Sequence, residues 1–233
     1  MTEAEWPACS DPEHTLAFVQ TRASCRKHRL FGCGCCRRVW HLLTDPRSRA
    51  AVERAELYAD GHITQQELSA AQVGADRATG QWNPRNLVRA QAEERVSAIR
   101  CLAAARAAKA AARPSDYLNT LSKSIRDALS CSLLAEYGFR LTPPPEQPVY
   151  CDLVRCVFGN PFQSVPIDPE WRTGTAVALA GQMYADREFS AMPILADALE
   201  DAGCTSVEIL NHCRGPGPHL RGCWVVDLLL GRE

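Results

Sequence analysis

The sequence of 233 residues has no long apolar run, almost no net charge and no strand-like alternation of apolar and polar residues. Its late apolar stretch, Cys223 to Leu230, spans eight residues and contains Asp227, whereas a membrane-spanning helix needs about 20 apolar residues. The N-terminus lacks a positively charged start followed by an apolar segment, so a secretion signal is not expected. These absences predict a soluble, cytoplasmic protein without a membrane partner.

The absence of sustained strand alternation and of paired turn residues argues against a sheet and leaves an all-α fold. Helix signals recur instead, because three Asp-Pro pairs precede helix-favouring residues: Asp11-Pro12, Asp45-Pro46 and Asp168-Pro169. Aspartate caps the free amides of a first helical turn, and proline fits the first helical position. We expect an array of about nine or ten helices, among them helices at 25–43, 149–158, 171–185, 193–202, 206–213 and 220–230.

Residues 142–148, which include four prolines, form the one clear linker, because consecutive prolines favour extended chain and cannot continue a helix. The linker divides an N-terminal, Cys-rich helical subdomain (1–141) from a C-terminal helical subdomain (149–233). Residues 22–54 carry nine Lys or Arg and two acids, whereas residues 168–233 carry ten acids and five arginines. The two ends are therefore expected to attract each other.

The sequence contains no motif from which a complete reaction can be assembled, so an enzyme is the less favoured interpretation. Its twelve cysteines are too few to indicate a disulfide scaffold, and most are expected to be reduced thiols that pack as small apolar side chains. Reactive side chains are most concentrated in residues 212–227, called the dense stretch below. Two histidines, two cysteines and two arginines lie there among three glycines and two prolines.

One hypothesis for this stretch is a cysteine-dependent hydrolase. Cys213 or Cys223 would be the nucleophile, His212 or His219 the base, and Asp227 would orient that base. If the segment were helical, His219, Cys223 and Asp227 would follow one another at intervals of four residues on one face. The same face suits core packing equally well, since it also carries Trp224.

A second hypothesis is a structural zinc site. Cys33 and Cys36 form a Cys-x-x-Cys pair, and two thiolates at this spacing can turn toward one ion and supply half of a tetrahedral site. The other half would come from the stretch between 212 and 223, in which His212 is a further donor. The candidate ligands are Cys33, Cys36, Cys213, His219 and Cys223. The alternative is that the thiols at 33, 35 and 36 only pack between closely spaced helices; no other cofactor is indicated.

Asp227 lies in an apolar segment, Val-Val-Asp-Leu-Leu-Leu, where an unpaired carboxylate is costly. Its expected partner is an arginine of the Cys-rich helix or of the nearby stretch: Arg37, Arg38, Arg214 or Arg221. A pair with the Cys-rich helix would join that helix to the C-terminal one. Trp224, on the same predicted C-terminal helix, is expected to pack.

Charge favours a protein partner over a nucleic acid. The aromatics of the basic stretch, Phe31 and Trp40, are expected to pack inside, and the sequence pI of about 6.6 is not high. A solvated helix face is the simpler interpretation of the basic residues. The acidic helices between 193 and 213 are instead expected to present a protein-interaction surface made of Asp197, Glu200, Asp201 and Glu208.

Four segments of the sequence are similar to segments of a known protein family: LFGCGCCRR from residue 30, FGNPF from 158, PILADALEDAGC from 193 and HCRGPGPHLRGCW from 212. Together they resemble an uncharacterised bacterial family that is expanded in planctomycetes. Residues 195–203 are also weakly similar to the planctomycete repeat-companion domain, with Leu195 and Ala198 in place of its aromatics. The resemblance implies a folded module and no particular activity. The sequence therefore predicts a helical protein-interaction or scaffold module, with a structural zinc protein and then a cysteine-dependent hydrolase as alternatives.

Overall fold

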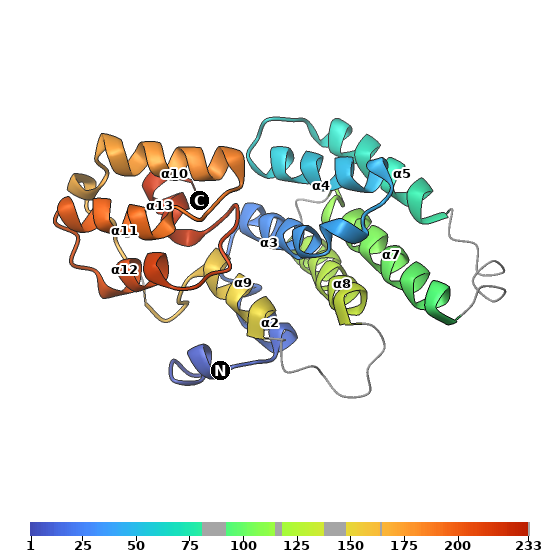
Figure 1. Ribbon diagram of the computed structural model, residues 1–233, viewed down its shortest axis with the longest axis horizontal. Helices are drawn as coiled ribbons and strands as arrows, with labels where there is room; N and C mark the ends of the chain where they lie inside the picture. Colours follow the sequence, from blue (N-terminus) through green and yellow to red (C-terminus); the bar gives the residue numbers. More distant parts are fainter. Residues whose placement is uncertain (81–91, 115–117, 138–147, 164, 233) are drawn as a thin grey trace. The chain divides into compact units, whose positions relative to one another are not determined.

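The computed structural model describes residues 1–80, 92–114, 118–137, 148–163 and 165–232 (Figure 1). Every regular element in this part of the chain is a helix, which confirms the all-α prediction. Among the same residues, no helix is both long and apolar enough to cross a membrane. The chain divides into two compact units: unit 1 comprises residues 1–22 and 148–233, and unit 2 comprises residues 23–147.

This division differs from the predicted one at the N-terminus, because the first 22 residues belong with the C-terminal part of the chain. The reason is that α2 (Pro12–Val19) packs against α9 (Pro148–Phe158). Arg155 of α9 strengthens the contact by donating hydrogen bonds to the carbonyl oxygens of Trp6, at 2.9 Å, and Cys9, at 2.6 Å. The predicted linker lies outside the described residues, except for its last residue, Pro148.

Unit 1 contains α1 (Glu5–Ala8), α2, α9, the 3₁₀ turn η2 (Pro169–Trp171), α10 (Gly174–Asp186), α11 (Met192–Asp201), α12 (Val207–Arg214) and α13 (Trp224–Leu230). Asp11 caps α2 as predicted, and Ser206 caps α12. Asp168 caps only the short turn η2, and the helix predicted from 171 begins later, where Thr173 accepts a hydrogen bond from an amide of the first turn. Polar caps therefore set where these helices begin.

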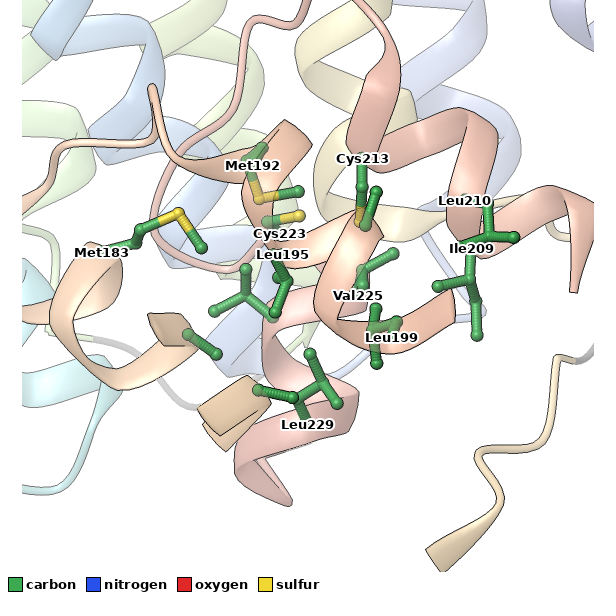
Figure 2. Close-up of a cluster of buried hydrophobic side chains, with 14 of the residues drawn as sticks. Met183, Met192, Leu195, Leu199, Ile209, Leu210, Cys213, Cys223, Val225 and Leu229 are labelled. Atoms are coloured by element: carbon green, nitrogen blue, oxygen red, sulfur yellow. The ribbon is translucent and has the colours of Figure 1, made fainter. Parts of the chain in front are cut away.

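The core of unit 1 is formed by one buried face from each of α10, α11, α12 and α13. Leu195, Leu199 and Ile209 are at most 1 % exposed and meet there because apolar residues recur at helical spacing. Figure 2 shows these side chains with those of Met183, Met192, Val225 and Leu229. Cys213 and Cys223 belong to the same cluster, so two cysteines of the dense stretch are core residues.

Unit 2 contains α3 (Cys25–Arg38), the 3₁₀ turn η1 (Trp40–Leu42), α4 (Pro46–Ala59), α5 (Gln65–Gly80), α7 (Ala92–Ala111) and α8 (Leu118–Tyr137). The helix predicted at 25–43 ends at Arg38, because the buried Val39 leaves the helical conformation and the chain tightens into η1. Helix α3 packs closely on α8, and a Cβ added at Gly32 would lie 2.6 Å from Cδ1 of Ile125. Glycine therefore permits the close approach of these two helices.

Candidate metal centre

Four side chains of unit 1 converge on one point: Cys156, His212, His219 and Cys223. One sulfur or ring nitrogen from each lies within 4.8 Å of the other three. Nε2 of His212 lies 3.2 Å from Sγ of Cys223, and Nδ1 of His219 lies 3.8 Å from Sγ of Cys156. A tetrahedral zinc ion with ordinary bond lengths would separate a sulfur from a nitrogen ligand by about 3.5 Å. The group could therefore hold a metal ion.

The four candidate ligands come from three different segments of the backbone. Cys156 projects from the last turn of α9, and His212 from the last turn of α12. His219 lies in the loop between α12 and α13, and Cys223 is the N-cap residue of α13. Two helix ends and one irregular loop thus meet at the site, which only the tertiary fold brings together.

The conformation of the loop at 215–223 depends on its glycines. Gly215 ends α12, and Gly217 and Gly222 have φ angles of 76° and 91°, in the left-handed region that glycine adopts without strain. A Cβ added at Gly217 would lie 3.2 Å from Cδ2 of His219, so a larger residue would press on the imidazole. The ring of His219 also meets that of His212 edge to face, with centroids 4.9 Å apart.

The helix predicted at 220–230 begins only at Trp224, because the glycines and prolines before it keep the chain irregular. The shared helical face of His219, Cys223 and Asp227 is therefore not formed. His212, from the preceding helix, is instead the imidazole that lies 3.2 Å from Cys223. Trp224 lies beside the site, with its ring centroid 5.3 Å from that of His212.

The two cysteines of the dense stretch have opposite electrostatic surroundings. Burial opposes the thiolate of Cys223, but hydrogen bonds with Cys156 and His212 and the positive charge of His212 outweigh it and hold the pKa of Cys223 well below its ordinary value. Burial raises the pKa of Cys213, and the neighbouring Cys223 adds to this effect. Cys223 therefore favours the thiolate, the form that binds metals, whereas Cys213 stays a neutral core thiol.

One side of the group faces a cavity of about 250 Å³. Three of the four candidate ligands line it, together with Asp152, Arg155, Asn211 and the loop residues Gly215, Pro216, Gly217 and Pro218. Cys223 is not among the lining residues and is 0 % exposed. Nε2 of His219 is buried and has no hydrogen-bond partner in the described part of the chain. A metal-bound imidazole commonly donates from its second nitrogen to water, which a cavity can supply.

The structure brings together some of the ligands predicted from the sequence and not others. His219 and Cys223, with the further donor His212, belong to the group, whereas Cys213 does not. Cys156 was missed, because it lies in an apolar helical segment where a cysteine looks like any small core residue. Its spacing from the other three ligands gives no signal, since 63 residues separate it from His219.

Cys33 and Cys36 lie in unit 2, in the core that α3 forms with α4, α7 and α8. Both are at most 1 % exposed, and the Cys33 thiol lies 3.8 Å from the carbonyl oxygen of Val52. Burial raises the pKa of both thiols well above the ordinary value. These surroundings favour neutral, packed cysteines, and Cys35 is buried in the same way.

Asp227 is 1 % exposed and lies in α13. Among the predicted arginine partners, Arg37 forms two hydrogen bonds of 2.9 Å with the carboxylate of Glu56. Arg221 donates to the carbonyl oxygen of Tyr184, at 2.8 Å. An ion pair of Asp227 with one of the predicted arginines stays a prediction.

The four acids of the predicted interaction surface are exposed, as expected: Asp197, Glu200, Asp201 and Glu208. Arg214 pairs with two of them, because its Nη2 lies 3.2 Å from Asp197 and 2.5 Å from Glu200. Part of the negative charge is therefore balanced within unit 1. Contact of these acids with a partner protein stays a prediction.

Comparison with known protein families, with curated proteins and with solved structures finds no match. The family resemblance of the sequence stays a prediction, and function is inferred from the residues of the site.

Proposed function

We propose that this is a structural zinc protein in which Cys156, His212, His219 and Cys223 bind one Zn²⁺. The observation that carries the proposal is the convergence of two sulfurs and two ring nitrogens within 4.8 Å. Two cysteines and two histidines are a donor set that structural zinc sites use. All four ligands belong to the protein, and this complete tetrahedral set is typical of a structural rather than a catalytic zinc site.

The donor chemistry favours zinc over other metals. Magnesium and calcium prefer oxygen ligands, and the converging atoms are sulfur and nitrogen. A tetrahedral set of two thiolates and two imidazoles suits zinc. The pKa of Cys223 is lowered by its neighbours in the group, so one of the two sulfurs is already disposed to be a thiolate.

The metal would stabilise the irregular part of unit 1. The loop at 215–223 contains no helix, yet it positions both His219 and Cys223. A zinc ion would tie this loop to the ends of α9 and α12, and binding to a site that forms only in the folded chain stabilises that chain. The function of the centre would then be to hold the C-terminal helices in a fixed arrangement.

The hydrolase hypothesis has less support. Cys223 and His212 form the thiol–imidazole pair that such an enzyme needs. However, Cys223 is 0 % exposed and does not line the cavity, so a substrate bound in the cavity would not meet its sulfur.

Metal analysis of the full chain, purified without added metal, tests the proposal. We expect about one equivalent of zinc per chain, and loss of that zinc in Cys156→Ser. Cys151→Ser is the matched control, because Cys151 is a buried thiol of the same helix outside the group. A native chain that carries no zinc and binds none on titration would overturn the proposal, as would equal zinc content in the two variants.

A further inference from the structure

The proposed zinc centre borders the core of unit 1 on one side and the cavity on the other. Cys156 and Cys223 both belong to the apolar core of unit 1, in which Figure 2 labels Cys223. Cys156 lines the cavity together with the two histidines. A small molecule entering the cavity therefore meets the sulfur of Cys156 before that of Cys223.

We propose that the centre is also a peroxide-sensitive switch, in which Cys156 and Cys223 are oxidised to a disulfide and the metal is released. This inference rests on the proposed function, since it concerns the regulation of the same site. The oxidant is hydrogen peroxide, which is small enough to enter a cavity of about 250 Å³.

The chemistry balances in two steps. The Cys156 thiolate attacks one oxygen of hydrogen peroxide, the O–O bond breaks, and the products are a sulfenic acid and a hydroxide ion. The Cys223 thiolate then attacks the Cys156 sulfur, the S–S bond forms, and a second hydroxide leaves. Two protons from solvent convert both hydroxides to water. One peroxide is thereby reduced by two electrons, one from each cysteine sulfur.

The arrangement of the ligands favours this pair of cysteines. Their sulfurs lie within 4.8 Å of each other, so condensation needs no large movement of the chain. A disulfide removes two of the four zinc ligands and leaves only His212 and His219. Two imidazoles are fewer than the three or four protein ligands that zinc sites use. Formation of the disulfide between Cys156 and Cys223 would therefore also release the metal.

The experiment uses the full chain loaded with zinc and treated with excess hydrogen peroxide. Released zinc is followed with a chromogenic chelator, and cysteine states are mapped by alkylation and mass spectrometry. We expect release of about one equivalent of zinc, a disulfide between Cys156 and Cys223, and recovery of both thiols and of zinc binding after addition of a dithiol reductant.

Two variants test the assignment. Cys156→His keeps a zinc ligand but removes one thiol of the pair, and its release of zinc should be at least about tenfold slower. Cys151→Ser, altered elsewhere on the same helix, should release zinc as the native chain does.

Each outcome has a distinct meaning. A chain that holds no zinc before peroxide is added overturns the proposed function and this inference with it. A chain that holds zinc and keeps it in peroxide overturns the inference alone. A disulfide that joins Cys223 to Cys213, which lies in the same core, would also overturn it. The peptide map of the native chain decides the question even if Cys156→His binds no metal.

Discussion

The two groups of cysteines in this protein differ in their partners rather than in their burial. Cys33 and Cys36 in unit 2 and Cys156 and Cys223 in unit 1 are all at most 1 % exposed. The unit 2 pair lies among valine, leucine and alanine side chains, and burial raises the pKa of both thiols. Cys223 in unit 1 has two histidines within reach, and its pKa is lowered.

This difference shows which surroundings would suit a buried cysteine to bind a metal. Burial alone favours the neutral thiol, which packs well and binds metals poorly. A nearby imidazole and a second sulfur reverse that preference, and they also supply the remaining ligands. The density of cysteines in the sequence around residue 33 is therefore a weaker indicator of a metal site than the four residues that unit 1 gathers from separate segments.

The largest expected effect is that of metal removal, which should change unit 1 and leave unit 2 as it was. Free zinc at a thousandfold excess over its Kd stabilises a folded chain by about 4 kcal/mol. For unit 1, which is about half of the chain, that corresponds to a fall in Tm of roughly 15–20 °C when a chelator removes the zinc. Hydrogen exchange, measured by mass spectrometry, should accelerate in the loop at 215–223 and in α12. Equal acceleration in α3 would contradict the contrast between the two units.

The features that were predicted well from the sequence depend on residues that lie close together in the chain. Asp11 and Asp45 cap α2 and α4 as expected, because a cap and its helix lie within one turn of each other. Thr64 and Glu67 have the Thr-x-x-Glu spacing of a capping box and form one, in which the amide of each residue donates to the side chain of the other. The prediction that residues 220–223 are helical was wrong, because the loop before Trp224 continues through them.

The candidate site was predictable only in part, for a physical reason. His212, His219 and Cys223 lie in one stretch, so their unusual density is visible in the sequence. Cys156 joins them only because α9 packs against α13 in the folded unit, and no local pattern reports such a contact. The Cys-x-x-Cys spacing of Cys33 and Cys36 indicated half a zinc site, but on α3 the same spacing directs both thiols into an apolar core.

The second prediction concerns the ion pair between Arg37 and Glu56, which links α3 to α4 in unit 2. Glu56 is buried, and removing one member of a buried pair is strongly destabilising. We expect Glu56→Gln to lower the free energy of unfolding by about 2–4 kcal/mol, less than for a fully buried pair because the Arg37 side chain is 27 % exposed. Denaturant titration measures the change. Zinc content should stay that of the native chain, since the pair belongs to unit 2.

The control for this prediction is Asp76→Asn, which removes the partner of Lys109 from an exposed pair of the same unit. Exposed pairs contribute about 0–1 kcal/mol, so the change should be small. If the two variants lost the same stability, the buried pair would have no special role in unit 2.

A smaller effect is expected where α3 approaches α8. In Gly32→Ala the new Cβ would lie 2.6 Å from Cδ1 of Ile125, so Ile125 or the helices must shift. Overpacking of this kind costs about 1–3 kcal/mol. The matched control is Gly74→Ala in α5, where the nearest atom to the new Cβ lies 3.8 Å away. That variant should gain up to about 1 kcal/mol from helix propensity. Denaturant titration that gives the opposite order would refute the close approach of α3 and α8.

The smallest effect is the pH dependence that His28 gives to unit 2. His28 is 1 % exposed, and burial lowers its pKa below the ordinary value of 6.5, an effect that its hydrogen bond with the carbonyl oxygen of Ser24 partly offsets. The unfolded chain takes up a proton on His28 near pH 6.5, whereas the folded chain keeps the ring neutral until the pH is lower. As the pH falls from 6.5 through the folded pKa, the unfolded state therefore binds more protons and unit 2 loses stability.

Above pH 6.5 both states carry a neutral His28, so the residue adds no pH dependence there. His28→Gln should flatten the decline in stability between pH 6.5 and lower values, as measured by hydrogen exchange in α3. His62→Gln, which alters an exposed histidine of the same unit, serves as the control and should keep the decline. Readout in α3 separates this effect from acid release of zinc, because the candidate ligands lie in unit 1. A decline of equal steepness in both variants would mean that burial of His28 does not set the pH response of unit 2.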